Sequence, residues 1–210
     1  CLPLSQRRMG AVAGVVGGRL VVAGGACDGD DDGEDLSSVE AYTGTGWTPL
    51  PPMPHEAWMA TACVLNGRLY VIGGHDSNKL QVLEMTEENG LSWTRKADLP
   101  ATRSFAASVV HEGKIVVMGG KVDIREPSTV SVVVYDPAED TWAAAAPLPN
   151  PISTYILPQL KSNGEIVVLT RRRSGVQLVR RDRRTSQWVA EAGLRIDHAP
   201  SGEPGALLLG

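Results

Sequence analysis

The sequence predicts an all-β protein assembled from repeated four-stranded antiparallel sheets, and two periodic features carry this prediction. A stretch of turn, apolar strand and Gly-Gly, seen at residues 66–74, recurs along the chain. Its copies close at Gly24-Gly25, Gly73-Gly74, Gly119-Gly120 and a degenerate Leu169-Thr170, with spacings of 49, 46 and 50 residues. A second series, Trp47, Trp93, Trp142 and Trp188, has spacings of 46, 49 and 46 residues. Such a period indicates one supersecondary unit used several times.

Each unit has the same order of elements. A Pro-containing entry leads to a strand of small residues, as at residues 105–110, and a Gly turn leads to the apolar strand that ends in Gly-Gly. A polar loop precedes a third strand, such as residues 128–135, and the fourth strand starts near the Trp. Strands of about five residues between Gly, Pro, Asn and Asp turns leave no room for a helix. We expect one repeat domain over 1–210, with units at about 1–52, 53–98, 99–147 and 148–193 and the start of a fifth at 194–210.

The residue types indicate how the sheets pack. Continuous Val, Ile and Leu runs suit a middle strand that is covered on both faces. Small residues such as Ala13 and Gly14 suit a crowded inner edge. Gly-Gly lets a neighbouring aromatic ring close over the backbone, and one Trp per unit fills the space between adjacent sheets, where truncation costs about 3–5 kcal/mol. The sheets bury both faces only when they stack on one another.

These marks resemble the kelch repeat, a β-propeller unit of about 50 residues that carries Gly-Gly, Tyr-Asp and Trp. The third unit has all of them, including Tyr135-Asp136 and Trp142. The first keeps Tyr42 without the Asp, the second has Glu84-Met85, and the fourth has Arg181-Asp182. The resemblance implies a propeller of four-stranded antiparallel blades. Because such propellers usually close with about six or seven blades, and the chain begins with Cys1, we expect an incomplete ring within a longer protein.

Composition limits the classes of partner and the compartment that we expect. Charged residues are 21% of the chain and its net charge is −4, which gives no general reason to expect nucleic acid or membrane as a partner. No apolar run approaches the roughly 20 residues of a membrane helix. Cys1, Cys27 and Cys63 form an odd, sparse set that favours a reducing compartment and a cytoplasmic location. We expect Cys63 to be a buried, inert thiol.

Each of two charged clusters can be interpreted either as solvated surface or as an ion-binding site. The run Asp28–Asp35 matches positions 1, 3, 5 and 6 of a calcium-binding EF-hand loop, but the twelfth position is Val39 rather than Glu. We favour a solvated loop, with weak divalent-cation binding as the alternative. For the basic residues we likewise favour a solvated face over an anion site. They are Arg171, Arg172, Arg173, Arg180, Arg181, Arg183 and Arg184.

The resemblance also raises an enzymatic alternative, a galactose oxidase-like or sugar-modifying kelch enzyme. Copper-dependent members need His and Tyr ligands and a Tyr crosslinked to Cys. Here His55, His75, His111 and His198 are scattered without ligand spacing, and Tyr42 and Tyr135 are framework positions. We therefore predict no catalytic residue, metal ligand or cofactor.

Binding is the function that the sequence favours. The loops between strands 2 and 3 and between strands 4 and 1 emerge on one face of a propeller, and they vary most between the units. The expected protein contacts are Arg7, Arg8, Trp58, His75, Asp76, Arg103, Ser104 and Tyr155. The stretch around Arg8 resembles kelch substrate adaptors of ubiquitin ligases, in which an Arg at this place meets an acidic peptide; pairing with a neighbouring loop is the open alternative. We expect a protein-interaction module, with substrate recognition for a ubiquitin ligase as the role that the resemblance implies. No nucleic acid, membrane or small-molecule partner is predicted.

Overall fold

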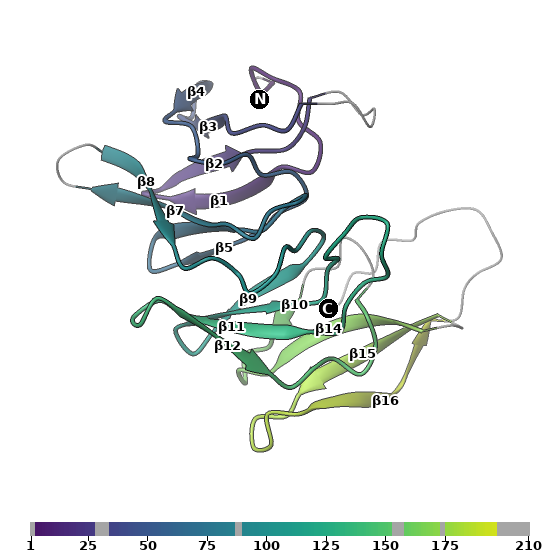
Figure 1. The fold of residues 1–210 in the computed structure, drawn as a ribbon. Coiled ribbons are helices and arrows are strands. Elements are labelled where there is room, and N and C mark those ends of the chain that lie inside the picture. Colours follow the sequence, from purple (N-terminus) through teal and green to yellow (C-terminus); the bar gives the residue numbers. More distant parts are fainter. Residues whose placement is uncertain (1–2, 28–33, 87–89, 153–157, 173–174, 197–210) are drawn as a thin grey trace.

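The computed structural model describes residues 3–27, 34–86, 90–152, 158–172 and 175–196 (Figure 1). The first sheet contains β1 (Val12–Val16), β2 (Arg19–Ala23), β3 (Val39–Tyr42) and β4 (Trp47–Leu50). The second contains β5 (Thr61–Leu65), β6 (Arg68–Ile72), β7 (Leu80–Thr86) and β8 (Gly90–Lys96). Within the described residues, no helix is long and apolar enough to cross a membrane.

The remaining described strands form two further sheets of the same kind. The third contains β9 (Ala107–His111), β10 (Lys114–Met118), β11 (Val132–Asp136) and β12 (Thr141–Ala145). The fourth contains β13 (Gln159–Leu160), β14 (Ile166–Arg172), β15 (Gly175–Arg181) and β16 (Trp188–Ile196). In each sheet the strands pair antiparallel in chain order, which makes each sheet a blade of four strands. We number the blades 1 to 4 along the chain.

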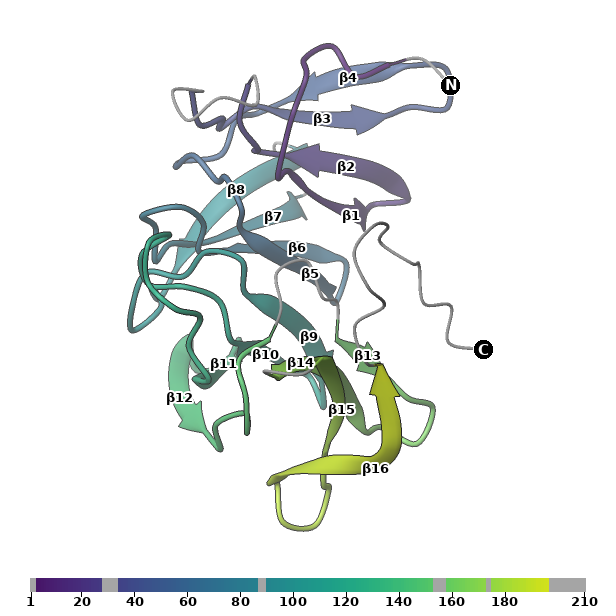
Figure 2. The same cartoon turned by 90° about the vertical axis from the view of Figure 1, so that its right-hand side faces the viewer.

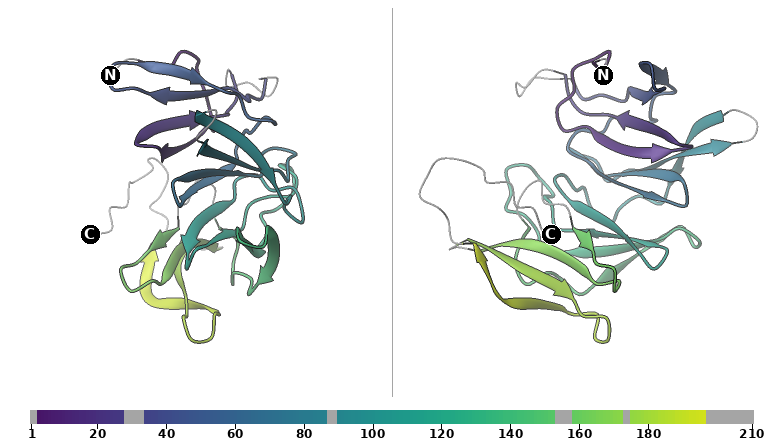
Figure 3. Two further views of the ribbon diagram at one scale, coloured as in Figure 1. Left: turned by 90° about the vertical axis from the view of Figure 1, so that its left-hand side faces the viewer. Right: turned by 180° about the vertical axis from the view of Figure 1, so that it is seen from behind.

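The blades are arranged radially in an arc, as Figures 2 and 3 show from three sides. The first strands lie side by side along the inner edge, where β5 contacts both β1 and β9. The fourth strands lie at the outer edge of their blades. This arrangement confirms the predicted all-β propeller of four-stranded antiparallel blades, and the arc is consistent with an open ring.

The hydrophobic core lies between the blades. One cluster joins blades 1 and 2 through residues such as Val21 and Leu69, a second joins blades 2 and 3, and a third joins blades 3 and 4. The middle strands β6 and β10 are buried along all but their first residue, as their continuous apolar runs predict. Each blade therefore depends on its neighbour for the burial of its faces.

The repeated Trp side chains link neighbouring blades by hydrogen bonds as well as by packing. Trp93 donates its Nε1–H to the carbonyl oxygen of Pro51 over 2.9 Å. The equivalent bonds run from Trp142 to Ala97 over 2.8 Å and from Trp188 to Ala146 over 2.9 Å. Each acceptor lies just after the fourth strand of the preceding blade. The indole thus places its ring between two sheets while its N–H finds a partner on the preceding blade.

The Gly-Gly pairs have a reason that differs from the predicted one. Gly73 has φ +68°, and a Cβ added there would lie 2.3 Å from the carbonyl oxygen of Arg103 in blade 3. Gly74 N–H donates to that same oxygen over 2.9 Å. Gly24 and Gly25 stand in the same relation to the carbonyl of Ala57. In these two pairs the backbone of the next blade approaches the first glycine, and at Gly119 the Ile152 side chain does so. The expectation of an aromatic ring over Gly-Gly is therefore wrong.

Two strand boundaries also differ from the prediction. The third strand of blade 3 begins at Val132 rather than at Ser128. In blade 4, β16 continues to Ile196 and pairs Arg195 with Gln177 across a bulge. Residues 194–196 therefore belong to the fourth blade, and the rest of the expected fifth unit lies outside the described residues.

Candidate functional site on the loop face

The loops between strands 2 and 3 and between successive blades emerge at one end of the blades, which we call the loop face. The hairpin turns between strands 1 and 2 and between strands 3 and 4 lie at the opposite end, the turn face. Antiparallel pairing in chain order dictates this division, because the chain reverses direction at every strand. The loop face is therefore where the variable segments of different blades meet.

Three equivalent residues form a rim at the inner edge of the blades on the loop face. Gly10, Met59 and Phe105 all have left-handed φ values, of 64°, 55° and 54°. Met59 N–H donates to Gly10 O over 3.1 Å, and Phe105 N–H donates to Met59 O over 2.9 Å. A left-handed Met or Phe costs about 1–3 kcal/mol, and this chain of bonds between blades holds them there. They line a cavity of about 340 Å³ together with the starts of β1 and β5.

Trp58, His75 and Asp35 form a cluster beside this rim, at the boundary of blades 1 and 2. The rings of Trp58 and His75 meet edge to face with centroids 5.0 Å apart. His75 Nδ1 lies 3.7 Å from a carboxylate oxygen of Asp35, and its Nε2 lies 3.9 Å from Asp76. Burial raises the pKa of Asp35, an effect that the nearby His75 partly offsets. Trp58, His75 and Asp76 were expected as contacts from the sequence, whereas Asp35 was expected only as part of the acidic run. The spacing of these residues does not show that the end of that run meets His75 of the next blade.

Trp58 also has a structural role that limits its availability. A Cβ added at Gly10 would lie 2.9 Å from Trp58 Cδ1, so the indole of blade 2 rests on the backbone of blade 1. Its Nε1 is buried and has no hydrogen-bond partner among the described residues. The indole therefore acts mainly as a wedge between two blades.

Arg8, expected to contact a partner, is instead buried by its own blade. Its side chain is 1% exposed and pairs with Glu40, Nη2 to Oε1 over 2.8 Å. Its Nη1 donates to the carbonyl oxygens of Gly24 and Ser38 over 2.9 and 2.8 Å. Of the two alternatives that the sequence left open, the structure favours pairing with a neighbouring loop. Arg8 is a framework residue because it closes the loop that follows β2.

Arg103 occupies the equivalent place in blade 3 and is buried in the same way. It is 5% exposed and donates from Nη1 to the carbonyl oxygens of Gly119 and Ser131 over 2.9 and 3.0 Å. Burial lowers the pKa of its guanidinium. Val133 stands where blade 1 has Glu40, and Arg103 Nε is buried without a partner among the described residues. Arg103 is thus also placed in the framework rather than on the surface.

The other expected contact residues divide between surface and interior. Arg7 and Asp76 are exposed, and the side chain of Asp76 is 78% exposed. Ser104 is 4% exposed and exchanges two backbone hydrogen bonds with Lys121. Tyr155 lies outside the described residues. Of the expected contact residues in this group, Arg7 and Asp76 are therefore the ones available to a partner.

The loop that follows β10 adds two contact candidates that sequence reasoning missed. Val122 and Ile124 are 51% and 36% exposed on this loop. The loop is held by its own groups: Lys121 Nζ donates to Ile124 O over 2.8 Å, and Arg125 N–H donates to Asp123 Oδ1 over 2.8 Å. Thr102 Oγ1 also donates to Val122 O over 2.8 Å. In the sequence, the signal for these two contact candidates was the presence of apolar residues within a polar loop.

Among the described residues, no group of three or more His, Cys, Asp or Glu side chains could hold a metal ion. Residues 28–33 of the acidic run lie outside the described part of the chain. Burial raises the pKa of the Cys63 thiol to about 12, which keeps it protonated at neutral pH. Cys27 Sγ accepts a hydrogen bond from Gln6 Nε2.

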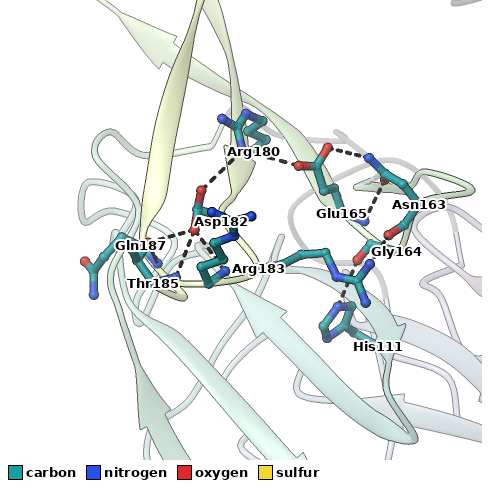
Figure 4. A network of polar contacts seen from close by, with 10 residues as sticks. His111, Asn163, Gly164, Glu165, Arg180, Asp182, Arg183, Thr185 and Gln187 are labelled. Atoms are coloured by element: carbon teal, nitrogen blue, oxygen red, sulfur yellow. Dashed lines mark hydrogen bonds and ion pairs between the residues drawn. The ribbon is translucent and has the colours of Figure 1, made fainter.

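The basic cluster of blade 4 is split between the two ends of the blade. Arg171 and Arg172 pair with Val176 and Gly175 at the loop-face end of the β14–β15 hairpin. Arg180 pairs with Val167 near the other end, so residues 180–184 lie on the turn face. There Arg183 reaches across to Asn163 and His111 reaches to Gly164 (Figure 4). The basic residues of the two segments therefore do not form one continuous face.

Comparison with known proteins agrees with the architecture. The Kelch motif model matches residues 59–85 and 102–149. The chain therefore contains kelch repeats. It is 31% identical to F-box protein AFR of Arabidopsis thaliana over 117 residues, covering 52% of this chain and 31% of that protein. It is 29% identical to Kelch-like protein 35 of Mus musculus over 136 residues, covering 61% of this chain and 22% of that protein.

The solved structure of YjhT shares the fold at a TM-score of 0.70 and 12% identity, over 90% of this chain and 70% of that one. At this identity the likeness concerns the fold alone. The matched region spans a third or less of the length of the two curated relatives.

Proposed function

We propose that this kelch domain is a protein-interaction module that binds a partner segment on its loop face. We further propose that the whole protein uses this contact to recognise a substrate for ubiquitin ligation. The sequence resemblance to substrate adaptors and the F-box named in the Arabidopsis relative support the second step. A cytoplasmic location, favoured by the sparse cysteines, is part of the proposal.

The binding role rests on a contrast between two groups of side chains on the loop face. One group has its hydrogen-bonding atoms satisfied within its own blade, and the other is exposed to solvent. Arg8 and Arg103 donate hydrogen bonds to backbone carbonyl oxygens of their own blades. In contrast, Met9, Val122 and Ile124 are 42%, 51% and 36% exposed beside a fixed rim. Exposed apolar side chains on ordered loops are suited to protein contacts, because little conformational freedom remains to be lost on binding.

Charged groups on the same face indicate the chemistry of the partner. Arg7 and the Asp76 carboxylate are exposed, and His75 lies beside Asp76. Exposed charges and exposed apolar side chains on one face are typical of protein–protein interfaces. The partner segment that fits is one with apolar side chains flanked by charges of both signs. The proposal does not require Arg8 or Arg103 to leave their buried positions.

Two Val residues provide a matched test of the binding face. A partner is first identified by proximity labelling with the full-length protein, and its affinity is then measured by calorimetry for Val122→Ser and Val189→Ser. Val122 is on the loop face at 51% exposure, and Val189 is on the outer strand of blade 4 at 39% exposure. We expect Val122→Ser to weaken binding about tenfold, a loss of about 1.4 kcal/mol, and Val189→Ser to leave it unchanged. Equal effects, or loss only with Val189→Ser, would place the contact elsewhere.

The ligase role needs a separate readout. In cells, we expect Val122→Ser to reduce ubiquitination of the identified partner, while Val189→Ser does not. If Val122→Ser abolishes binding but ubiquitination continues unchanged, the binding proposal stands and the adaptor role is wrong.

A further inference from the structure

The turn face of blade 4 carries a concentration of arginines that the loop-face function does not use. Residues 180–184 contain four Arg and a single Asp, in a chain whose net charge is −4. They end β15 and begin the turn to β16. This turn lies against the turn that joins β9 to β10 in blade 3, as Figure 4 shows for His111 and Arg183.

A small hollow of about 60 Å³ lies between the two turns. Its lining is polar and comes from both blades: His111, Glu112, Arg181, Asp182, Arg183 and Ser186. The guanidinium of Arg181 has no hydrogen-bond or ion-pair partner among the described residues, although it lines this hollow. An uncompensated guanidinium in a polar recess favours the entry of an anion.

Arg183 is fixed at the edge of this hollow by contacts on both sides. Its Nη1 donates to Asn163 O over 2.5 Å, and its Nη2 lies 4.0 Å from Glu112 Oε1. The backbone of Gly164 lies beneath it, since a Cβ added at Gly164 would be 3.4 Å from Arg183 Cζ. The planar group is thus oriented before any ligand arrives, with N–H groups left over for an acceptor.

Asp182 does not neutralise this positive charge fully, because its carboxylate is already engaged. Its Oδ1 accepts hydrogen bonds from Arg184 N, Thr185 N and Thr185 Oγ1 over 2.9, 2.8 and 3.1 Å. Its Oδ2 lies 3.6 Å from Arg180 Nη1. The backbone N–H of Thr185 contributes most to a lowered pKa of Asp182, so the carboxylate stays ionised as part of the turn. Glu112 is the less constrained acid, with a side chain 69% exposed.

We propose that this hollow binds a tetrahedral oxyanion of the phosphate type. Arg181 and Arg183 supply the forked N–H groups that match phosphate oxygens, and the Ser186 hydroxyl supplies a further donor. One ring nitrogen of His111 already contacts blade 4, since its Nε2 lies 2.9 Å from Gly164 O. Glu112 competes for Arg183 and limits the affinity. The site is independent of the loop face and lies at the other end of the blades.

The test is titration of the full chain with inorganic phosphate by calorimetry, at an ionic strength held constant with chloride. We expect saturable binding that Arg181→Gln weakens at least fivefold. Arg19→Gln removes the same charge from an exposed residue at the start of β2, also on the turn face, and is expected to leave binding unchanged. Glu112→Gln is expected to tighten binding, because it removes the competing carboxylate.

Several results would overturn the site: absence of saturable binding, equal losses for Arg181→Gln and Arg19→Gln, or weaker binding with Glu112→Gln. A comparison of two ligands, O-phosphoserine and inorganic phosphate, identifies the source of the anion. Tighter binding of O-phosphoserine than of inorganic phosphate supports a phosphorylated side chain as the ligand, and the reverse order supports free phosphate. The midpoint of urea unfolding, measured without phosphate, identifies any variant that is simply misfolded.

Discussion

Arg8 and Glu40 form a buried ion pair in blade 1, with Nη2 and Oε1 2.8 Å apart and side chains only 1% and 3% exposed. The pair is complete, because Glu40 Oε2 also accepts a hydrogen bond from Ser5 N–H over 2.9 Å. In blade 2, neutral groups occupy the equivalent positions. There Ala57 replaces the Arg, and Gln81 bonds the backbone N–H and C=O of His55 over 2.8 and 3.1 Å.

This comparison within one chain gives the first prediction. Glu40→Gln should lower the free energy of unfolding by about 3–5 kcal/mol, because it leaves the buried charge of Arg8 without its partner. The double variant Arg8→Ala/Glu40→Gln reproduces the Ala and Gln of blade 2 and should be more stable than Glu40→Gln alone. Urea unfolding of the three chains measures the order. A double variant less stable than the single one would show that the charge of Arg8 is not the source of the loss.

Asp140 gives a prediction about acid stability. It accepts hydrogen bonds from Ala97 N–H of blade 2 over 2.9 Å and from the Tyr135 hydroxyl over 2.6 Å. These bonds, the one from Ala97 above all, lower the pKa of Asp140. Since the folded pKa lies below the ordinary value of about 3.9, the stabilisation is present above that value and is lost as the pH falls through the folded pKa.

Asp140→Asn is the matched variant, because Asn keeps an acceptor oxygen for Ala97 and tolerates the φ of +52° at this position. We expect its free energy of unfolding to change less than that of the wild type between about pH 4 and pH 2, a window below the ordinary Asp pKa. Unfolding by urea at a series of pH values gives both slopes. Parallel slopes would mean that Asp140 does not contribute to acid sensitivity.

The repeat pattern predicted the blades well because it depends on packing within and between neighbouring units. Each Trp and each apolar middle strand has the same surroundings in every copy, so its role follows from its period. The aromatic ring expected over Gly-Gly was wrong because the sequence does not show which backbone approaches from the next blade. That approach depends on the path of the loop before Arg103 or Ala57.

The site was harder to predict because burial of a loop residue depends on partners far along the chain. Arg8 meets Glu40 32 residues later, and their spacing alone does not show the pairing. One signal was available, since Arg8 and Arg103 both stand 16 residues before the first Gly of their Gly-Gly pair. A residue repeated in register belongs more naturally to the framework than to a variable binding surface.

Gly73 and Gly67 separate two effects of replacing a glycine. Both have left-handed φ values, +68° and +72°, but a Cβ at Gly73 would meet Arg103 O at 2.3 Å, whereas a Cβ at Gly67 would meet nothing within 4 Å. Gly67→Ala should therefore cost only the conformational penalty of about 1–2 kcal/mol. Gly73→Ala should cost clearly more, because blade 3 must shift away. Equal losses on urea unfolding would show that the contact between the blades yields without cost.

Cys63 provides a prediction about thiol reactivity. Burial raises its pKa to about 12, and only the thiolate reacts rapidly with alkylating reagents. Cys63 and Cys27 are both only partly buried, so exposure does not distinguish them. In the native chain at pH 8, iodoacetamide should alkylate Cys63, with its raised pKa, more slowly than Cys27. In urea, peptide mapping by mass spectrometry should find both residues alkylated. Ser108 lies against this thiol from the neighbouring blade, so rapid alkylation of Cys63 under native conditions would mean that blades 2 and 3 separate readily, contrary to the packed interface described above.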